Sequence, residues 1–128
     1  STAKDLAKFG YQTVCGDFLS KETQKMMITP QKQANGAPTP YGIGWSLPVR
    51  EDIDLERMSG RAHVRHSGGA NGGTSMLYVL PKQKISVAII VNLQGVNRIG
   101  ELCENVAMQF ENFEEKAKLP YAAKDDRM

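Results

Sequence analysis

One stretch of the sequence, residues 65–75, combines a histidine, two serines and two glycine pairs in the order RHSGGANGGTS. Glycine is costly inside regular structure because it loses more backbone freedom on folding than any other residue. Two interpretations stay open from spacing alone. Gly68 and Gly69 either leave backbone N–H groups free to touch a ligand, or they form a β-bulge before a turn at 71–73 that needs positive φ angles.

Other patterns that could bind ions or phosphate carry less weight. No G-K-[ST] follows the glycines, which argues against a phosphate loop. His63 and His66 form an H-x-x-H, but on a strand this spacing points them to opposite faces. The acidic cluster at 51–54 lacks EF-hand spacing and is typical of a solvated loop. We therefore expect no metal and no cofactor.

Composition gives no electrostatic argument for nucleic acid or a membrane as a partner. The chain has 128 residues, 41% of them hydrophobic and 23% charged, with a formal net charge of +2, which is typical of a globular domain. This small charge favours neither nucleic acid nor a membrane as a partner. The first residues lack the layout of a signal peptide and do not begin with Met, so we expect the chain to start inside a longer one.

For Cys15 and Cys103 we expect free buried thiols, with a disulfide as the open alternative.

Helical patterns dominate the first third of the chain. Ser1 is the expected cap of a helix that ends near Gly16, because apolar residues recur there at helical spacing. A second short helix is expected to begin at Ser20 and to stop before Pro30. The following loop, TPQKQANGAPTP, marks the boundary between a helical segment at 1–35 and a mainly β segment.

Residues 40–118 are expected to form an antiparallel sheet followed by a helix. The stretch YGIGWSLPV reads as a strand with Tyr41 and Trp45 in the core. RAHVRHSGG, TSMLYVLP and ISVAIIVNLQG follow as strands joined by short turns, which indicates a meander. The last of these has a large apolar face and a smaller one on which a helix can pack closely.

The strongest helical pattern follows, and we expect this helix to lie across the sheet. Residues 119–128 read as a frayed tail. The predicted fold class is therefore α+β, a meander of three to four strands with an amphipathic C-terminal helix on one face and short N-terminal helices. The apolar face of that C-terminal helix consists of Ile99, Leu102, Cys103, Val106, Ala107, Phe110 and Phe113.

The order of these motifs resembles the C-terminal part of the serine β-lactamase-like family. HSGG leads into GGTSMLYVLPKQKISVAIIVNLQG and a C-terminal helix, while STAKDLAKFG, ITPQ and YGIGW lie upstream. The family includes class C β-lactamases, penicillin-binding carboxypeptidases, related esterases and mitochondrial relatives. The resemblance extends over residues 1–115 and implies a partial β-lactamase/transpeptidase-like fold.

Only one of the family's three active-site motifs is present. The family's Lys/His-Ser/Thr-Gly stretch matches His66-Ser67-Gly68, but there is no Tyr-x-Asn. The letters S-x-x-K occur at Ser1–Lys4, within a helix start that the family uses elsewhere. The resemblance thus implies a C-terminal fragment of a serine hydrolase, inactive alone, whose parent protein supplies the nucleophile.

The resemblance also assigns roles to four residues. It makes the Gly69 N–H an oxyanion donor, and it makes Ser67 and Gly68 a substrate-binding wall. His66 takes the catalytic place of the family's usual Lys, or it is a packed strand residue. A neutral imidazole holds an anion less firmly than an ammonium does, which favours an ester or peptide over penicillin. Ser67 lacks a nucleophile-elbow context, so we do not expect it to be the nucleophile.

A second function stays open, namely a non-catalytic binding or assembly module that keeps the fold. Expected partners are a small-molecule or peptide substrate, the rest of the parent chain, and a second copy bound through a strand edge. The resemblance implies that this edge lies along 85–93, where the family has a neighbouring strand from the N-terminal end of the full chain, and without that strand the edge is open.

Overall fold

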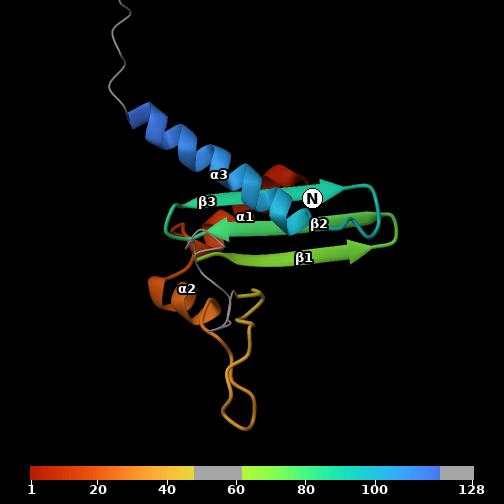
Figure 1. The fold of residues 1–128 in the computed structure, drawn as a ribbon. Coiled ribbons are helices and arrows are strands. Elements are labelled where there is room, and N and C mark those ends of the chain that lie inside the picture. Colours follow the sequence, from red (N-terminus) through yellow and green to blue (C-terminus); the bar gives the residue numbers. More distant parts are fainter. Residues whose placement is uncertain (48–61, 119–128) are drawn as a thin grey trace, which may run out of the picture.

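A three-stranded sheet lies between helices on its two faces (Figure 1). A computed structural model describes residues 1–47 and 62–118, with side chains as far as residue 111; the acidic cluster at 51–54, the side chain of Phe113 and the tail at 119–128 lie outside the described residues. The strands are antiparallel in the order β1-β2-β3, which confirms the predicted α+β meander. In chain order the elements are α1 (Ala3–Val14), α2 (Lys21–Met27), β1 (Val64–Ala70), β2 (Gly73–Leu80), β3 (Ile85–Val91) and α3 (Ile99–Lys118).

The cap of α1 is Thr2, not Ser1 as predicted. The Thr2 hydroxyl accepts a hydrogen bond from the Asp5 amide at 3.1 Å, and the Asp5 carboxylate accepts one from the Thr2 amide at 3.3 Å. This reciprocal capping box needs an acid three residues after the cap, which Ser1 does not have. The Thr2 hydroxyl also donates to the Asp5 carboxylate at 2.8 Å, and this bond together with the one from the Thr2 amide lowers the pKa of Asp5 below its ordinary value. The predicted start of α2 is confirmed, because the Ser20 hydroxyl accepts from the Thr23 amide.

Gly10 allows α1 to pack closely on one face of the sheet. A Cβ at this position would lie 2.7 Å from Leu77 Cδ1 and 2.9 Å from Ser86 Oγ. Val14 of α1 is buried in the same cluster as Leu77 and Val79 of β2. The small face that the sequence predicted for β3 is therefore the face that α1 covers.

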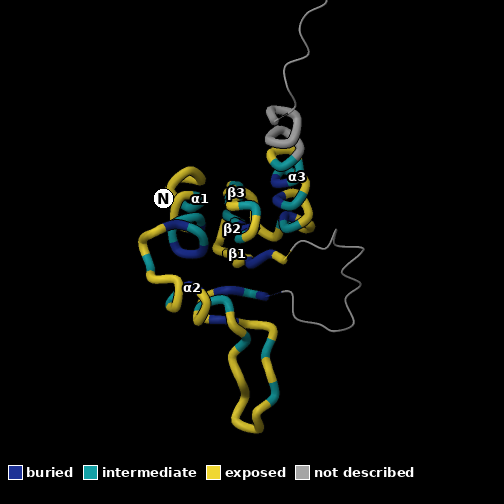
Figure 2. Tube along the Cα trace, turned by 90° about the vertical axis from the view of Figure 1, so that its left-hand side faces the viewer, coloured by how far each residue is buried: buried dark blue, intermediate teal, exposed yellow. Residues whose placement is uncertain are grey.

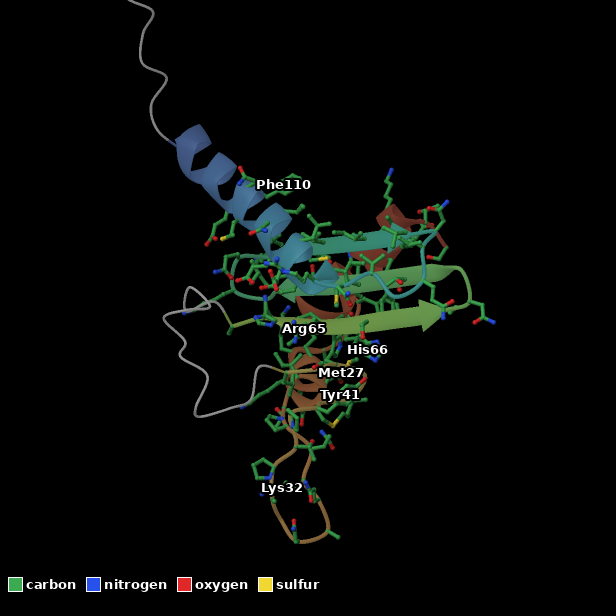
Figure 3. All side chains as sticks on the ribbon, turned by 45° about the vertical axis from the view of Figure 1, so that its right-hand side comes forward. Met27, Lys32, Tyr41, Arg65, His66 and Phe110 are labelled. Atoms are coloured by element: carbon green, nitrogen blue, oxygen red, sulfur yellow. The ribbon has the colours of Figure 1, made fainter. Side chains whose placement is uncertain are left out.

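α3 lies on the opposite face of the sheet (Figure 2). Two predicted core residues are exposed instead, Leu102 by 50% and Phe110 by 59%. Leu102 lies at the margin of the packed stripe, and Phe110 lies where α3 extends beyond the sheet (Figure 3). No helix in the described ranges is long and apolar enough to cross a membrane. The packed stripe of α3 consists of Ile99, Cys103, Val106 and Ala107.

Both cysteines are free thiols, as predicted, but Cys103 alone is buried as the prediction required. Cys103 is fully buried between α3 and the sheet, and Cys15 is half-buried at the end of α1. Burial raises the pKa of Cys103 to about 11 and also raises the pKa of Cys15. A protonated, buried thiol packs as a small apolar group, so Cys103 contributes to the core.

Residues 41–47 form a turn rather than the predicted strand. Tyr41 pairs with Ser46 across the turn, and Gly44 within it has φ +76°. A Cβ at Gly42 would lie 2.1 Å from the Met27 carbonyl oxygen, so the turn packs directly on the end of α2. Trp45 is buried as predicted, whereas Tyr41 is 40% exposed. The prediction for Tyr41 was wrong because a turn, unlike a strand, carries this side chain to the surface.

Candidate functional site

The glycine stretch belongs to β1, at an edge of the described sheet. Its register with β2 runs without interruption from Val64↔Val79 to Ala70↔Gly73, so the β-bulge interpretation is wrong. A tight turn follows, in which Gly72 alone of residues 71–73 has a positive φ, +78°. Gly68 and Gly69 are therefore ordinary strand residues in their backbone conformation, and their lack of a side chain needs another reason.

The outer edge of β1 is closed at one residue and open beyond it. Ser46 and Arg65 exchange two backbone hydrogen bonds, of 2.8 and 3.1 Å, on the side away from β2. Because backbone groups along a strand alternate between its two edges, the amides of Ser67 and Gly69 point the same way as that of Arg65. No backbone bond from residues 1–47 or 62–118 reaches these two amides.

The two glycines lack side chains for different reasons. A Cβ at Gly68 would lie 2.5 Å from the Ser75 hydroxyl oxygen, so Gly68 accommodates its cross-strand neighbour. A Cβ at Gly69 would meet nothing within 4 Å. Packing among the described residues therefore does not require Gly69 to be glycine, and close approach by a ligand or another segment is consistent with its bare backbone.

His66 and Ser67 lie on opposite faces of the sheet, as neighbours in a strand do. His66 borders an apolar cavity of about 310 Å³ on the α1 face. Ser67 reaches that cavity as well and also borders a second one on the α3 face. The lining of the first cavity comes from α1, α2, the turn at 41–47 and the sheet, and consists of Leu6, Phe9, Met27, Ile43, Gly44, Trp45, His66, Ser67, Gly68, Ser75 and Leu77.

The second cavity, of about 350 Å³, is polar and contains two arginines. Arg65 comes from β1, and Arg98 directly precedes α3. The Arg98 guanidinium donates to the Glu101 carboxylate at 2.8 Å, which raises the pKa of Arg98 and lowers the pKa of Glu101. Arg65 has no such acidic partner among the described residues. Ser67 thus shares a cavity with two guanidinium groups, of which Arg98 alone has an acidic partner within residues 1–47 and 62–118.

A third cavity, of about 360 Å³, borders the two glycines at the far end of β1. Gly68, Gly69 and Thr74 line it together with Ile90 of β3. The Thr74 hydroxyl also donates to the Leu93 carbonyl at 2.7 Å and accepts from the Val96 amide at 3.4 Å. The Thr74 hydroxyl thus fixes the loop leading into α3.

The two histidines lie in different environments. His63 is buried and stacks on Tyr78, with ring centroids 4.8 Å apart, whereas His66 is exposed and meets the Tyr41 ring at 6.0 Å. The described part of the chain holds no group of three His, Cys, Asp or Glu side chains that could bind a metal ion. The strand geometry thus separates the H-x-x-H as predicted.

Sequence reasoning missed three residues around the glycine strand. Arg65 and Arg98 are far apart in sequence, and Tyr41 was assigned to the core. Arg65 directly precedes HSGG, which is a signal that could have placed it at the site. Nothing in the sequence pairs it with Arg98, because that proximity depends on how α3 crosses the sheet.

The sequence of the chain is similar to known proteins over most of its length. The sequence model of the family described as Beta-lactamase matches residues 1–107. The chain is 27% identical over 142 aligned positions to the human protein "Serine beta-lactamase-like protein LACTB, mitochondrial", and 26% identical to its mouse counterpart. Each alignment covers 87% of this chain but 26% of the relative. The chain thus spans about a quarter of the length of the curated relatives it matches.

Proposed function

Since the chain belongs to the beta-lactamase family, we propose that it is the C-terminal part of a serine hydrolase and supplies one wall of its acyl-transfer site. The observation that carries this proposal is the open edge of β1, where the Gly69 amide points away from the sheet beside Ser67. The family membership supports a hydrolase-type fold, and the edge geometry supports the role of this particular strand.

The Gly69 N–H is suited to stabilise an oxyanion. Acyl transfer to a serine passes through a tetrahedral intermediate whose oxygen carries a negative charge, and one fixed donor at that oxygen contributes about 3 kcal/mol. A strand amide is fixed by its ladder, so it needs no reorganisation during the reaction. The open space around Gly69 lets a substrate carbonyl approach this amide closely.

Ser67 and Arg65 are suited to bind an anionic part of the substrate. Both line the cavity on the α3 face, and a guanidinium binds carboxylates through charge-assisted hydrogen bonds. Arg65 is the stronger candidate because Glu101 already neutralises Arg98. We therefore assign an ester, amide or peptide with a carboxylate near the scissile bond as the substrate class.

The nucleophile would come from elsewhere in the parent protein. The letters S-x-x-K at Ser1–Lys4 fall at the exposed start of α1, and neither residue lines any of the three cavities. The apolar cavity beside His66 provides a surface on which a further segment can pack. The relatives are about four times as long as the aligned part, which leaves ample chain for that segment.

A non-catalytic assembly role is the second candidate, and the position of β3 favours it. β3 is the other edge of the described sheet, and a strand edge offers unpaired N–H and C=O groups to an additional strand. The partner would be the rest of the parent chain or a second copy. In this case Gly69 and Ser67 would have no chemical role.

A fluorophosphonate probe separates the two candidates, because it labels an activated serine covalently. We expect the full-length parent to be labelled and this 128-residue chain alone to remain unlabelled. A parent that stays unlabelled while folded would favour the assembly module. Labelling of the isolated chain would contradict the assignment of the nucleophile to another segment.

A further inference from the structure

We propose that Tyr41 is a positioning residue, which fixes the orientation of the His66 imidazole at the edge of the apolar cavity. The catalytic consequence of this inference rests on the proposed function, whereas the positioning itself does not. The two rings are 6.0 Å apart at 73° between their planes, which is an edge-to-face arrangement (Figure 3). Aromatic pairs in this geometry contribute stabilisation in addition to that of the apolar area they bury.

The backbone of Tyr41 is held independently of its side chain. Its carbonyl accepts hydrogen bonds from the Gln31 amide at 2.8 Å and from the Thr39 hydroxyl at 3.1 Å. One residue further, the Gly42 amide donates to the Trp45 carbonyl at 2.7 Å, and the Trp45 side chain is almost fully buried. The turn therefore stays in place whatever side chain residue 41 carries.

The turn is also fixed to the strand that carries His66. Ser46, at the other end of the turn, exchanges two backbone bonds with Arg65, the residue before His66. Tyr41 and Ser46 pair across the turn, so backbone bonds fix the main chain of Tyr41, and the Cβ that carries its ring, relative to β1. A side chain attached to a backbone held in this way can restrict the rotation of a neighbouring ring.

An exposed imidazole rotates rapidly unless a neighbouring group restrains it. His66 is exposed, and the described residues give its ring the Tyr41 contact and no hydrogen bond. The orientation of the ring decides which nitrogen faces the cavity on the α1 face. Without Tyr41 we expect the imidazole to sample several rotamers, and any reaction that needs one nitrogen toward the cavity would slow.

The test compares Tyr41→Leu with Tyr41→Phe. Tyr41 is 40% exposed and its structural bonds come from its backbone, so both variants should fold. Phe keeps the ring, while Leu removes it. Phe18→Leu, at a residue that is 75% exposed and outside the three cavities, controls for the loss of any aromatic side chain.

The first readout is the NMR spectrum of the His66 ring, which can be assigned with His66→Gln because the chain has 2 histidines. We expect Tyr41→Leu to remove the ring-current shift and to average the side-chain couplings of His66. Tyr41→Phe and Phe18→Leu should preserve both. Unchanged His66 signals in Tyr41→Leu, or a Tyr41→Phe spectrum like that of Tyr41→Leu, would overturn the proposal.

The second readout is ester turnover by the full-length parent. Misplacement of a reacting group is costly, and we expect Tyr41→Leu to lower kcat by about tenfold with little change in KM, and Tyr41→Phe to restore it. Altered NMR signals with unchanged turnover would uphold the positioning by Tyr41 and overturn the catalytic role of His66. The two claims therefore fail separately.

Discussion

The two outer strands of the sheet differ in what they leave accessible. β1 is nearly bare at its far end, where Ser67, Gly68 and Gly69 are exposed and three cavities adjoin them. β3 is covered on one face by α1 and on the other by α3, and its residues are apolar except for Ser86. At an edge formed by glycines, a small molecule can reach the backbone N–H groups. An edge whose two faces are covered by helices can instead pair with another strand.

Backbone N–H groups along a strand alternate between its two edges, so the difference between β1 and β3 can be assigned to individual amides. On β1 the outward amides belong to Arg65, Ser67 and Gly69, of which Arg65 is already paired. Alternate residues of β3 form hydrogen bonds with β2, so the residues between them direct their backbone groups away from the sheet. The outward amides on this edge include those of Ala88 and Ile90. The comparison therefore predicts chemistry at Gly69 and strand pairing at Ala88 and Ile90.

The largest effect is expected from Gly69→Pro in the full-length parent. Proline removes the outward N–H and is tolerated at a strand edge, so acylation should slow by about 100-fold or more while the protein stays folded. Gly69→Ala keeps the N–H, and its Cβ would meet nothing within 4 Å, so its loss should be far smaller. The measurement is the acylation rate with an activated ester.

Equal acylation rates for Gly69→Pro and Gly69→Ala would contradict the assignment of the Gly69 N–H, at the β1 edge, as an oxyanion donor. Circular dichroism and a urea titration of both variants would show whether a lower rate reflects unfolding instead.

Hydrogen exchange should distinguish the two edges directly. In the full-length parent we expect the amides of Ala88 and Ile90 to be protected by an additional strand, slowing their exchange by about tenfold or more relative to this chain alone. The amides of Ser67 and Gly69 should exchange rapidly in both proteins. Fast exchange at Ala88 and Ile90 in the parent would show that β3 has no strand partner there.

A smaller effect is expected at the arginines of the polar cavity. Arg65→Gln should raise KM for a substrate bearing a carboxylate by about tenfold, since a hydrogen bond to a charged group contributes roughly 1.5–3 kcal/mol. Arg98→Gln should raise it less, because Glu101 already pairs with that guanidinium. The methyl ester of the same substrate is the control, and an equal KM increase for both substrates would exclude a carboxylate subsite.

The elements of the sheet could be predicted because their signals are local. Alternating apolar residues in ISVAIIV and the turn residues around Gly72 depend on neighbours in sequence, and both appear where expected. The face of α3 was predicted less well. Its periodicity includes Phe110, but only the position of the sheet determines how many turns of the helix are covered.

The surroundings of the site depended on contacts distant in sequence. Alternation suggested a strand at 41–49, but the contact of Gly42 with the end of α2 and the positive φ of Gly44 favour a turn. Only the pairing of Ser46 with Arg65 shows which amides of β1 remain open. Motif order was enough to propose HSGG as the candidate strand, whereas the proximity of Arg98 to it depends on the three-dimensional fold.

The most direct test of the central claim is the NMR signal of the Gly69 amide in the full-length parent before and after reaction with a fluorophosphonate. The phosphonyl oxygen of the adduct mimics the oxyanion, so the Gly69 proton should move well downfield and exchange more slowly as it donates to that oxygen. A fully labelled parent in which the Gly69 signal stays unchanged would contradict the account.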